Sequence, residues 1–174
     1  MPPTEFHEFV TIIGTATTTE LEESGNNGFN TANPLGGYDL TDSGGLSIVK
    51  HNEDFEDAGI DDHGAYFRFN FGDLGPGEKK EFSIFYGAGD NEAAALASLG
   101  AVGAELYSLG QASGTDLFSA GGPVQNDATT FAFGFKGVGG IIILPPPGVP
   151  DAGSTFGLLG MALAGLVGFA RSRK

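Results

Sequence analysis

The chain has 174 residues, with 30 glycines, 15 phenylalanines and no cysteine, and its formal net charge is -14. Such an acidic balance excludes a protein that binds the backbone of nucleic acids, because that role needs a surplus of Lys and Arg. The absence of cysteine excludes disulfide bonds, thiol catalysis and zinc sites built on cysteine.

The N-terminal third carries two weak strand patterns, in a chain long enough for one domain of ordinary size. We expect strands within residues 9–17 and 46–50, and a loop over the glycine- and asparagine-rich residues 25–37. The first residues lack a basic region followed by an apolar one, so no secretory signal peptide is predicted. Either the body is cytoplasmic or the true start lies upstream, and the C-terminal tail favours the second interpretation.

Residues 51–63 form a dense acidic segment between His51 and His63. Six carboxylates in ten residues suit Ca²⁺, which takes six to eight oxygen ligands. The calcium ligands that we predict are Asp54, Glu56, Asp57, Asp61 and Asp62. The EF-hand pattern fails, since no glycine stands at its sixth position counted from Asn52. Two other interpretations stay open: a solvated acidic loop, and a transition-metal site that uses both histidines with a carboxylate.

Residues 66–71 alternate aromatic and polar side chains, which is typical of a half-buried strand. One face carries Phe67, Phe69 and Phe71. Aromatic residues that share one face of a strand usually belong to the core, so we interpret these three as core residues. The alternative is an exposed platform on which sugars stack.

A second alternating run covers residues 81–86, and Phe85 interrupts its polar face. The residues expected to point inward are Phe82, Ile84 and Tyr86. The breaker-rich residues 72–77 separate this run from the previous one. Such turn chemistry predicts that the two runs pair as a hairpin.

The spacing of apolar residues changes to a helical period after Asp90-Asn91-Glu92, a capping sequence with an early acid. The apolar stripe expected to pack onto the sheet is Leu96, Leu99, Val102 and Leu106. We expect the helix to end near residues 108–110, and a loop over 111–127. Residues 130–136 then predict a third clear strand with three phenylalanines on one face.

Together these patterns predict a mainly β fold: an antiparallel, sandwich-like domain with one packed α-helix, followed by a single C-terminal transmembrane helix. The charge is divided accordingly. Residues 1–150 hold 5 basic and 21 acidic residues, whereas residues 151–174 hold 3 basic residues and one acid. We therefore expect an extracytoplasmic β-rich domain over residues 1–140, a proline-rich linker over 141–150 and a signal over 151–174.

The tail contains an uncharged run of 17 residues over 154–170, followed at once by Arg171, Arg173 and Lys174. As a helix the run would be about 25 Å long, which is marginal for the hydrocarbon core of a bilayer of about 30 Å. The basic residues would then lie at the cytoplasmic face. The alternative is a buried core helix, which rarely stands between a proline-rich linker and a basic cluster.

The order of these parts resembles a known sorting signal. Val149, Pro150, Asp151, Ala152 and Gly153, then an apolar helix, then basic residues, are similar to the VPDSG-CTERM variant of the PEP-CTERM class, with Ala in place of the usual Ser. The resemblance implies that a membrane-embedded exosortase recognises the motif, removes the helix and delivers the body outward. Such systems occur in Gram-negative bacteria that make exopolysaccharide and biofilm.

Catalysis has little support in the sequence, because neither Gly-x-Ser-x-Gly nor His-Glu-x-x-His occurs. We expect no enzyme, although a dispersed Ser-His-Asp triad stays open. The expected function is that of an exported surface or biofilm-matrix protein with a structural or adhesive role. Its expected partners are an exosortase, the membrane before processing and an exopolysaccharide. The alternative is an extracellular module that binds calcium or polysaccharide.

Overall fold

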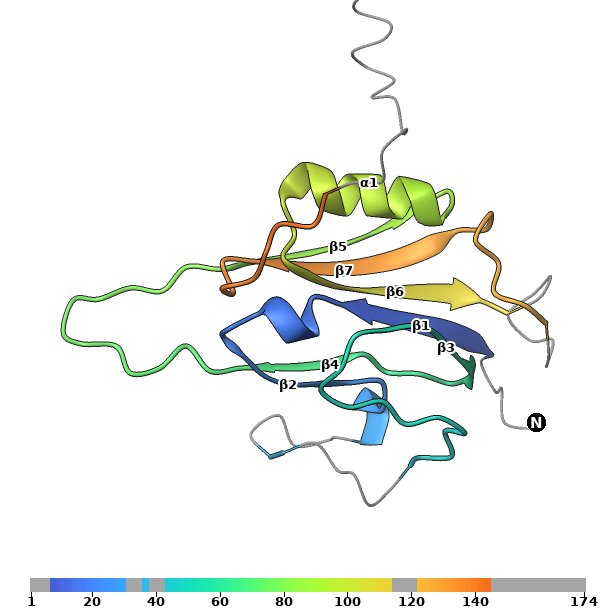
Figure 1. Ribbon diagram of the computed structural model, residues 1–174, viewed down its shortest axis with the longest axis horizontal. Helices are drawn as coiled ribbons and strands as arrows, with labels where there is room; N and C mark the ends of the chain where they lie inside the picture. The colour runs from blue at the N-terminus through green and yellow to red at the C-terminus, as the bar shows by residue number, and fades with distance from the viewer. Residues whose placement is uncertain (1–6, 31–35, 38–42, 114–121, 145–174) are drawn as a thin grey trace, which may run out of the picture.

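The computed structural model describes residues 7–30, 36–37, 43–113 and 122–144. These residues form seven β-strands, one α-helix and two short 3-10 helices (Figure 1). In chain order the elements are β1 (Glu8–Ile13), η1 (Thr15–Thr17), β2 (Leu21–Gly25), η2 (Gly28–Asn30), β3 (Phe55–Asp61), β4 (Tyr66–Phe69), β5 (Ser83–Gly89), α1 (Glu92–Val102), β6 (Leu106–Ala112) and β7 (Thr130–Lys136). The expectation of a mainly β, antiparallel domain with one helix is confirmed.

Five strands form one antiparallel sheet in the order β3-β1-β6-β7-β5, and β2 and β4 form a small second sheet. Helix α1 packs on one face of the large sheet and the β2–β4 sheet on the other (Figure 1). Alternation along β7 divides the two faces: Phe135 contacts β4, whereas Ala132 belongs to the cluster under α1. The described part of the chain is therefore built in three layers.

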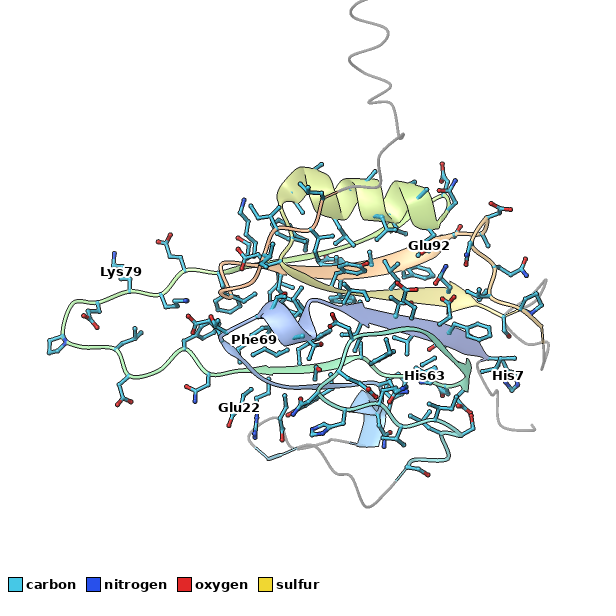
Figure 2. The ribbon with its side chains drawn as sticks, viewed as in Figure 1. His7, Glu22, His63, Phe69, Lys79 and Glu92 are labelled. Atoms are coloured by element: carbon cyan, nitrogen blue, oxygen red, sulfur yellow. The ribbon has the colours of Figure 1, made fainter. Side chains whose placement is uncertain are left out.

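The core between the two sheets is centred on Phe135 of β7. Its ring lies 4.9 Å from the ring of Phe67 and 5.0 Å from that of Phe69, centre to centre. Phe69 reaches from β4 toward the large sheet (Figure 2), and Phe71 stacks on it. The interpretation of these three phenylalanines as core residues is confirmed, since all three pack against the buried cluster of the large sheet.

Helix α1 begins and ends where its capping residues require. The Asn91 side chain accepts a hydrogen bond from the backbone N–H of Ala94, and Gly103 takes a left-handed conformation with φ 70° that favours glycine. The helix therefore ends at Val102, and the expected end near residues 108–110 is wrong. Of the predicted stripe, Leu99 is buried under the helix, whereas Leu106 lies in β6 and joins the other core.

The predicted hairpin between residues 66–71 and 81–86 is also wrong. Strand β4 pairs with β2 in the small sheet, and β5 pairs with β7 in the large one. The chain between them makes a long loop that projects from the body (Figure 1). The physical reason is that β7 offers β5 a regular ladder of seven residue pairs, while the phenylalanines of β4 are needed to cover Phe135.

The acidic segment contains a strand that the sequence analysis missed. Strand β3 pairs with β1 at three points, with register shifts between them. Its buried residues Phe55 and Ala58 are three positions apart, so the period of two that marks a strand is absent. The expected strand over residues 46–50 is not formed: the Asn26 side chain binds the backbone of Ile48 and Lys50 there instead.

Candidate functional site

The predicted calcium ligands are spread along β3 and its ends. Asp54 Oδ1 accepts hydrogen bonds from the backbone N–H groups of Gly14 and Thr15, at 3.0 and 2.7 Å. Asp61 Oδ2 accepts from the backbone and the hydroxyl of Ser47, at 2.9 and 2.6 Å. Both carboxylates therefore hold neighbouring loops in place.

The other three predicted ligands, Glu56, Asp57 and Asp62, are exposed. Within the ranges that the structure covers, no three His, Asp or Glu side chains are arranged to hold a metal ion. The acidic side chains therefore do not converge at one point, and calcium binding stays a prediction.

The two histidines that flank the acidic segment have separate surroundings. His63 is buried, and its Nδ1 lies 3.3 Å from the side-chain nitrogen of Asn26. Burial lowers the pKa of His63, although the nearby carboxylates of Asp61 and Asp62 act in the opposite direction. His51 lies with its Nε2 4.0 Å from Glu23 Oε1 on β2. Each imidazole thus contacts a different side chain of the small-sheet region.

The Glu105 carboxylate gathers three backbone hydrogen bonds. Oε1 accepts from the backbone of Gly137 at 3.0 Å, and Oε2 accepts from Val138 at 2.9 Å and Gly140 at 3.0 Å. Burial raises the pKa of Glu105, but these backbone N–H groups outweigh it, so the pKa lies below its ordinary value. The cluster fixes the segment that leaves β7.

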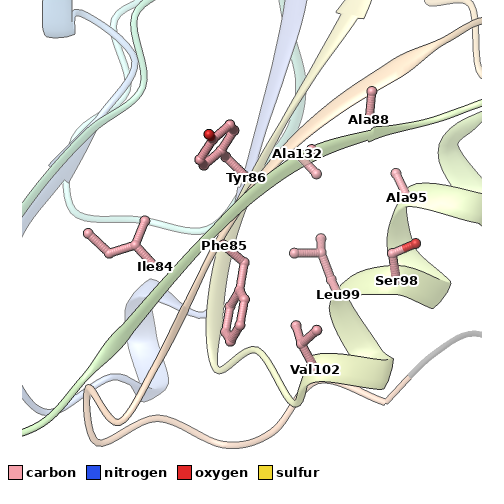
Figure 3. A pocket seen from close by; sticks show the side chains of 10 residues that line it. Ile84, Phe85, Tyr86, Ala88, Ala95, Ser98, Leu99, Val102 and Ala132 are labelled. Atoms are coloured by element: carbon pink, nitrogen blue, oxygen red, sulfur yellow. The ribbon is translucent and has the colours of Figure 1, made fainter.

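A pocket lies between strand β5 and helix α1 (Figure 3). Its volume is about 440 Å³. From the strand it is lined by residues that include Phe85 and Gly87, and from the helix by Ser98, Leu99 and Val102. The lining carries no charged side chain. Apolar pockets of this size are common sites of contact with partners or ligands.

The opposite face of β5 and β7, together with Phe82 just before β5, carries an exposed apolar surface. Its members are Phe82, Ile84, Tyr86, Phe131 and Phe133, which are 44% to 82% exposed. A fully exposed side chain of this size has an area of about 200 Å². The five side chains together therefore expose roughly 600 Å², which is the upper end for the largest exposed apolar patch of a monomer. The rings of Tyr86 and Phe133 stack at 6.0 Å. This face therefore suits contact with another molecule.

Sequence reasoning placed Ile84 and Tyr86 of β5 inside the protein, and the structure corrects it. Phe82, one residue before β5, was expected inside as well; it is 44% exposed, but its ring stacks on Phe71 at 4.9 Å. The small sheet covers the β3-β1-β6 side of the large sheet and reaches Phe135, but it leaves the β5 end uncovered. The available signal was Phe85, which makes β5 apolar on both sides. A strand of that kind is either buried on both faces or left with one apolar face exposed.

The sorting-motif residues 149–153 and the basic residues Arg171, Arg173 and Lys174 lie outside the described residues. The expected membrane helix over residues 154–170 lies outside them as well. No helix within the described part of the chain is long and apolar enough to cross a membrane.

Comparison with protein families shows that residues 148–174 fit the family model described as the VPDSG-CTERM motif. Comparison with curated proteins and with solved structures found no significant match. The family match covers the same residues in which the sequence places the Val-Pro-Asp motif, the uncharged run and the basic end. The chain therefore carries a C-terminal VPDSG-CTERM motif, consistent with a sorting domain of the PEP-CTERM type.

Proposed function

We propose that the chain is an exported protein of the cell surface or biofilm matrix of a Gram-negative bacterium, with a structural or adhesive role and no enzymatic activity. The observation that carries the proposal is the match of residues 148–174 to the VPDSG-CTERM motif. A structural role is supported by the uncharged apolar surface of β5 and β7, which suits contact with other molecules.

In this proposal an exosortase recognises residues 149–153 while the apolar run holds them at the membrane. As a helix the run of 17 uncharged residues would be about 25 Å long, just enough to hold the motif at a hydrocarbon layer of about 30 Å, and Arg171, Arg173 and Lys174 would keep its end on the cytoplasmic side. Cleavage at the motif then frees an acidic body on the outer side. The motif residues act in recognition, and the chemistry belongs to the exosortase.

The alternative, a module that binds calcium or polysaccharide, gains little from the described residues. The carboxylates expected to bind calcium do not converge, and the phenylalanines considered for sugar stacking pack against Phe135. A structural or adhesive protein is therefore the function that we favour.

The proposal is tested by changing the motif in a host that carries an exosortase. We expect the double variant Pro150→Ala, Asp151→Asn to stay in the membrane fraction, because recognition of the motif is lost. The control Pro146→Ala changes a linker proline outside the motif and is expected to be processed normally. Cell fractionation and mass spectrometry of the C-terminus provide the measurement.

Released wild-type protein is expected to lack the residues after the motif. Finding Lys174 intact on the released protein would exclude cleavage, and equal release of the double variant and the control would exclude recognition of the motif.

A further inference from the structure

Strand β5 is an outer strand of the large sheet, and the described residues do not protect it against further pairing. It bonds to β7 over all seven residues in a continuous register, and its other edge has no strand partner among the described residues. An outer strand exposes a row of backbone N–H and C=O groups that another strand can pair with. Proteins usually block such an edge with charges, prolines or bulges, and the seven residues of β5 contain neither charge nor proline.

The opposite edge of the same sheet shows the usual protection. Strand β3 carries Glu56, Asp57 and Asp61, and its register with β1 is broken by two irregularities. Charges and bulges of this kind prevent edge-to-edge association. The two edges of one sheet therefore differ: β3 is blocked and β5 is open.

The side chains of β5 lack neighbours on the open side. Tyr86 faces Phe133 of β7 on one side but is 82% exposed, and Ile84 is 55% exposed although it faces Phe135. Cross-strand pairs are the unit of stabilisation in a sheet. Both side chains would gain such partners if a strand were added to β5.

Within the described ranges helix α1 is also exposed on the side of β5. It has a single charged residue, Glu92, at its first position, and its exposed residues further along are Ala93, Ser98, Ala101 and Val102. A helix that faces solvent usually carries charged residues on that side. Ser98 and Val102 also line the pocket beside β5, so the apolar surface continues from the strand edge onto the helix.

We propose that two copies of this chain associate through β5, which pairs with β5 of the second copy in antiparallel orientation to give one sheet of ten strands. A two-fold axis perpendicular to the sheet makes both copies use the same surface. Even-numbered residues of one copy then lie opposite even-numbered residues of the other copy. Ile84 and Tyr86 therefore pair across the interface on the face that carries the exposed apolar surface. Phe85 of each copy lies on the other face, beside the apolar pocket of its partner.

The helices are compatible with this arrangement. Helix α1 contacts both β5 and β7, and neighbouring strands lie about 4.8 Å apart. Two helices related by the axis would then pass at about 10 Å, which is a normal packing distance for helices. The small residues Ala97 and Ala101 allow this approach.

The charges that flank β5 favour the antiparallel orientation. The residues before the strand, Glu78, Lys79, Lys80 and Glu81, carry no net formal charge together, whereas Asp90 and Glu92 follow it. Lys80 Nζ also pairs with Glu20 at 2.7 Å, and Lys79 and Glu92 lie toward opposite ends of the molecule (Figure 2). Antiparallel pairing keeps the acidic ends of the two strands apart. Parallel pairing would bring two acidic ends together, which is unfavourable in a chain of net charge -14.

Cysteine cross-linking tests the pairing directly, because the natural chain has no cysteine. A single cysteine is introduced in turn at each of positions 84 to 88 of the full chain in detergent, and mild oxidant is added. We expect strong intermolecular disulfide formation at the one position on the two-fold axis and weak formation at its neighbours. Glu56→Cys on β3 is the control and is expected to stay uncross-linked.

The oligomeric state provides the second measurement. Light scattering of the full chain is expected to give a dimer, and Tyr86→Lys is expected to give a monomer with an unchanged circular dichroism spectrum, because the side chain is exposed within one copy. Phe29→Lys is the matched control, since Phe29 is 68% exposed on η2, and it should remain dimeric. A monomeric wild type, equal cross-linking along all of β5, or cross-linking at position 56 would overturn the proposal.

Discussion

Glu105 illustrates how one side chain can organise a segment that has no regular structure of its own. The loop after β7 contains Gly137, Gly139 and Gly140, whose backbone N–H groups would otherwise point at solvent or lie unpaired. A carboxylate that receives several such groups is held in its charged form. The same hydrogen bonds that lower the pKa of Glu105 therefore stabilise the loop.

Replacing Glu105 tests this interpretation. Glu105→Gln keeps the size but removes the charge, and we expect the free energy of unfolding to fall by about 1 to 2 kcal/mol, as for hydrogen bonds to a partly exposed charged group. Because the folded pKa lies below the ordinary value of 4.5, the stabilisation is present above pH 4.5 and is lost as the pH falls through the folded pKa. Urea unfolding at neutral and acidic pH measures both effects.

The exposed acid Glu56 provides the control for that experiment. Glu56→Gln removes an equal charge from β3 and is expected to change stability by less than about 0.5 kcal/mol. If the gap between wild type and Glu105→Gln stayed constant down to the lowest pH reached, the role of the charged carboxylate would be disproved.

At the scale of elements, β5 and α1 meet more closely than ordinary side chains permit. A Cβ added at Gly89 would collide with the backbone of Ala94 and Ala95 in the first turn of α1, whereas a Cβ at Gly87, two residues earlier, would meet nothing within 4 Å. The end of the strand therefore requires glycine so that the helix can cross over it.

This close approach predicts opposite effects for two substitutions on the same strand. Gly89→Ala must displace backbone and is expected to lower the free energy of unfolding by about 2 kcal/mol or more. Gly87→Ala is expected to be neutral or to stabilise by up to about 1 kcal/mol, because it restricts the unfolded chain. Thermal unfolding of both variants decides the matter, and equal melting temperatures would contradict the assigned contact.

Sequence predicted some elements well and others poorly for identifiable reasons. The run at residues 130–136 was assigned with its observed bounds, because three phenylalanines alternate between breaker-rich segments. Strand β3 was missed because its irregular pairing removes the period of two. The pairing of β5 could not be predicted, since strand partners far apart in sequence leave no local signal, and the turn residues 72–77 pointed to the wrong neighbour.

At the scale of the whole molecule, the acidic body sets conditions for the predicted calcium site. Residues 1–150 contain 21 acidic and 5 basic residues, so any dissolved cation screens the repulsion among them. A calcium site predicts more than screening: the melting temperature should rise further in calcium than in magnesium at equal ionic strength, because a ligand bound by the native state stabilises it. Differential scanning calorimetry in the two salts makes the comparison, and equal melting temperatures would disprove the predicted calcium site.

The motif at residues 148–174 was found from sequence alone because its three parts are local and ordered. The open edge of β5 is not local in this way, because it depends on which strands lie next to one another. The sorting motif was thus readable in the sequence, whereas the apolar surface of β5 required the fold.

The Glu105 cluster has a mechanical consequence. Beyond it, the Ile143 backbone N–H donates to the carbonyl of Ala104 at 2.8 Å, so the segment leading to Leu144 is tied to the start of β6. Strand β6 lies in the middle of the large sheet, between β1 and β7. Tension applied at Leu144 is therefore delivered to the centre of the sheet and shared by two flanking strands, so that a tethered body resists being peeled apart from its edge.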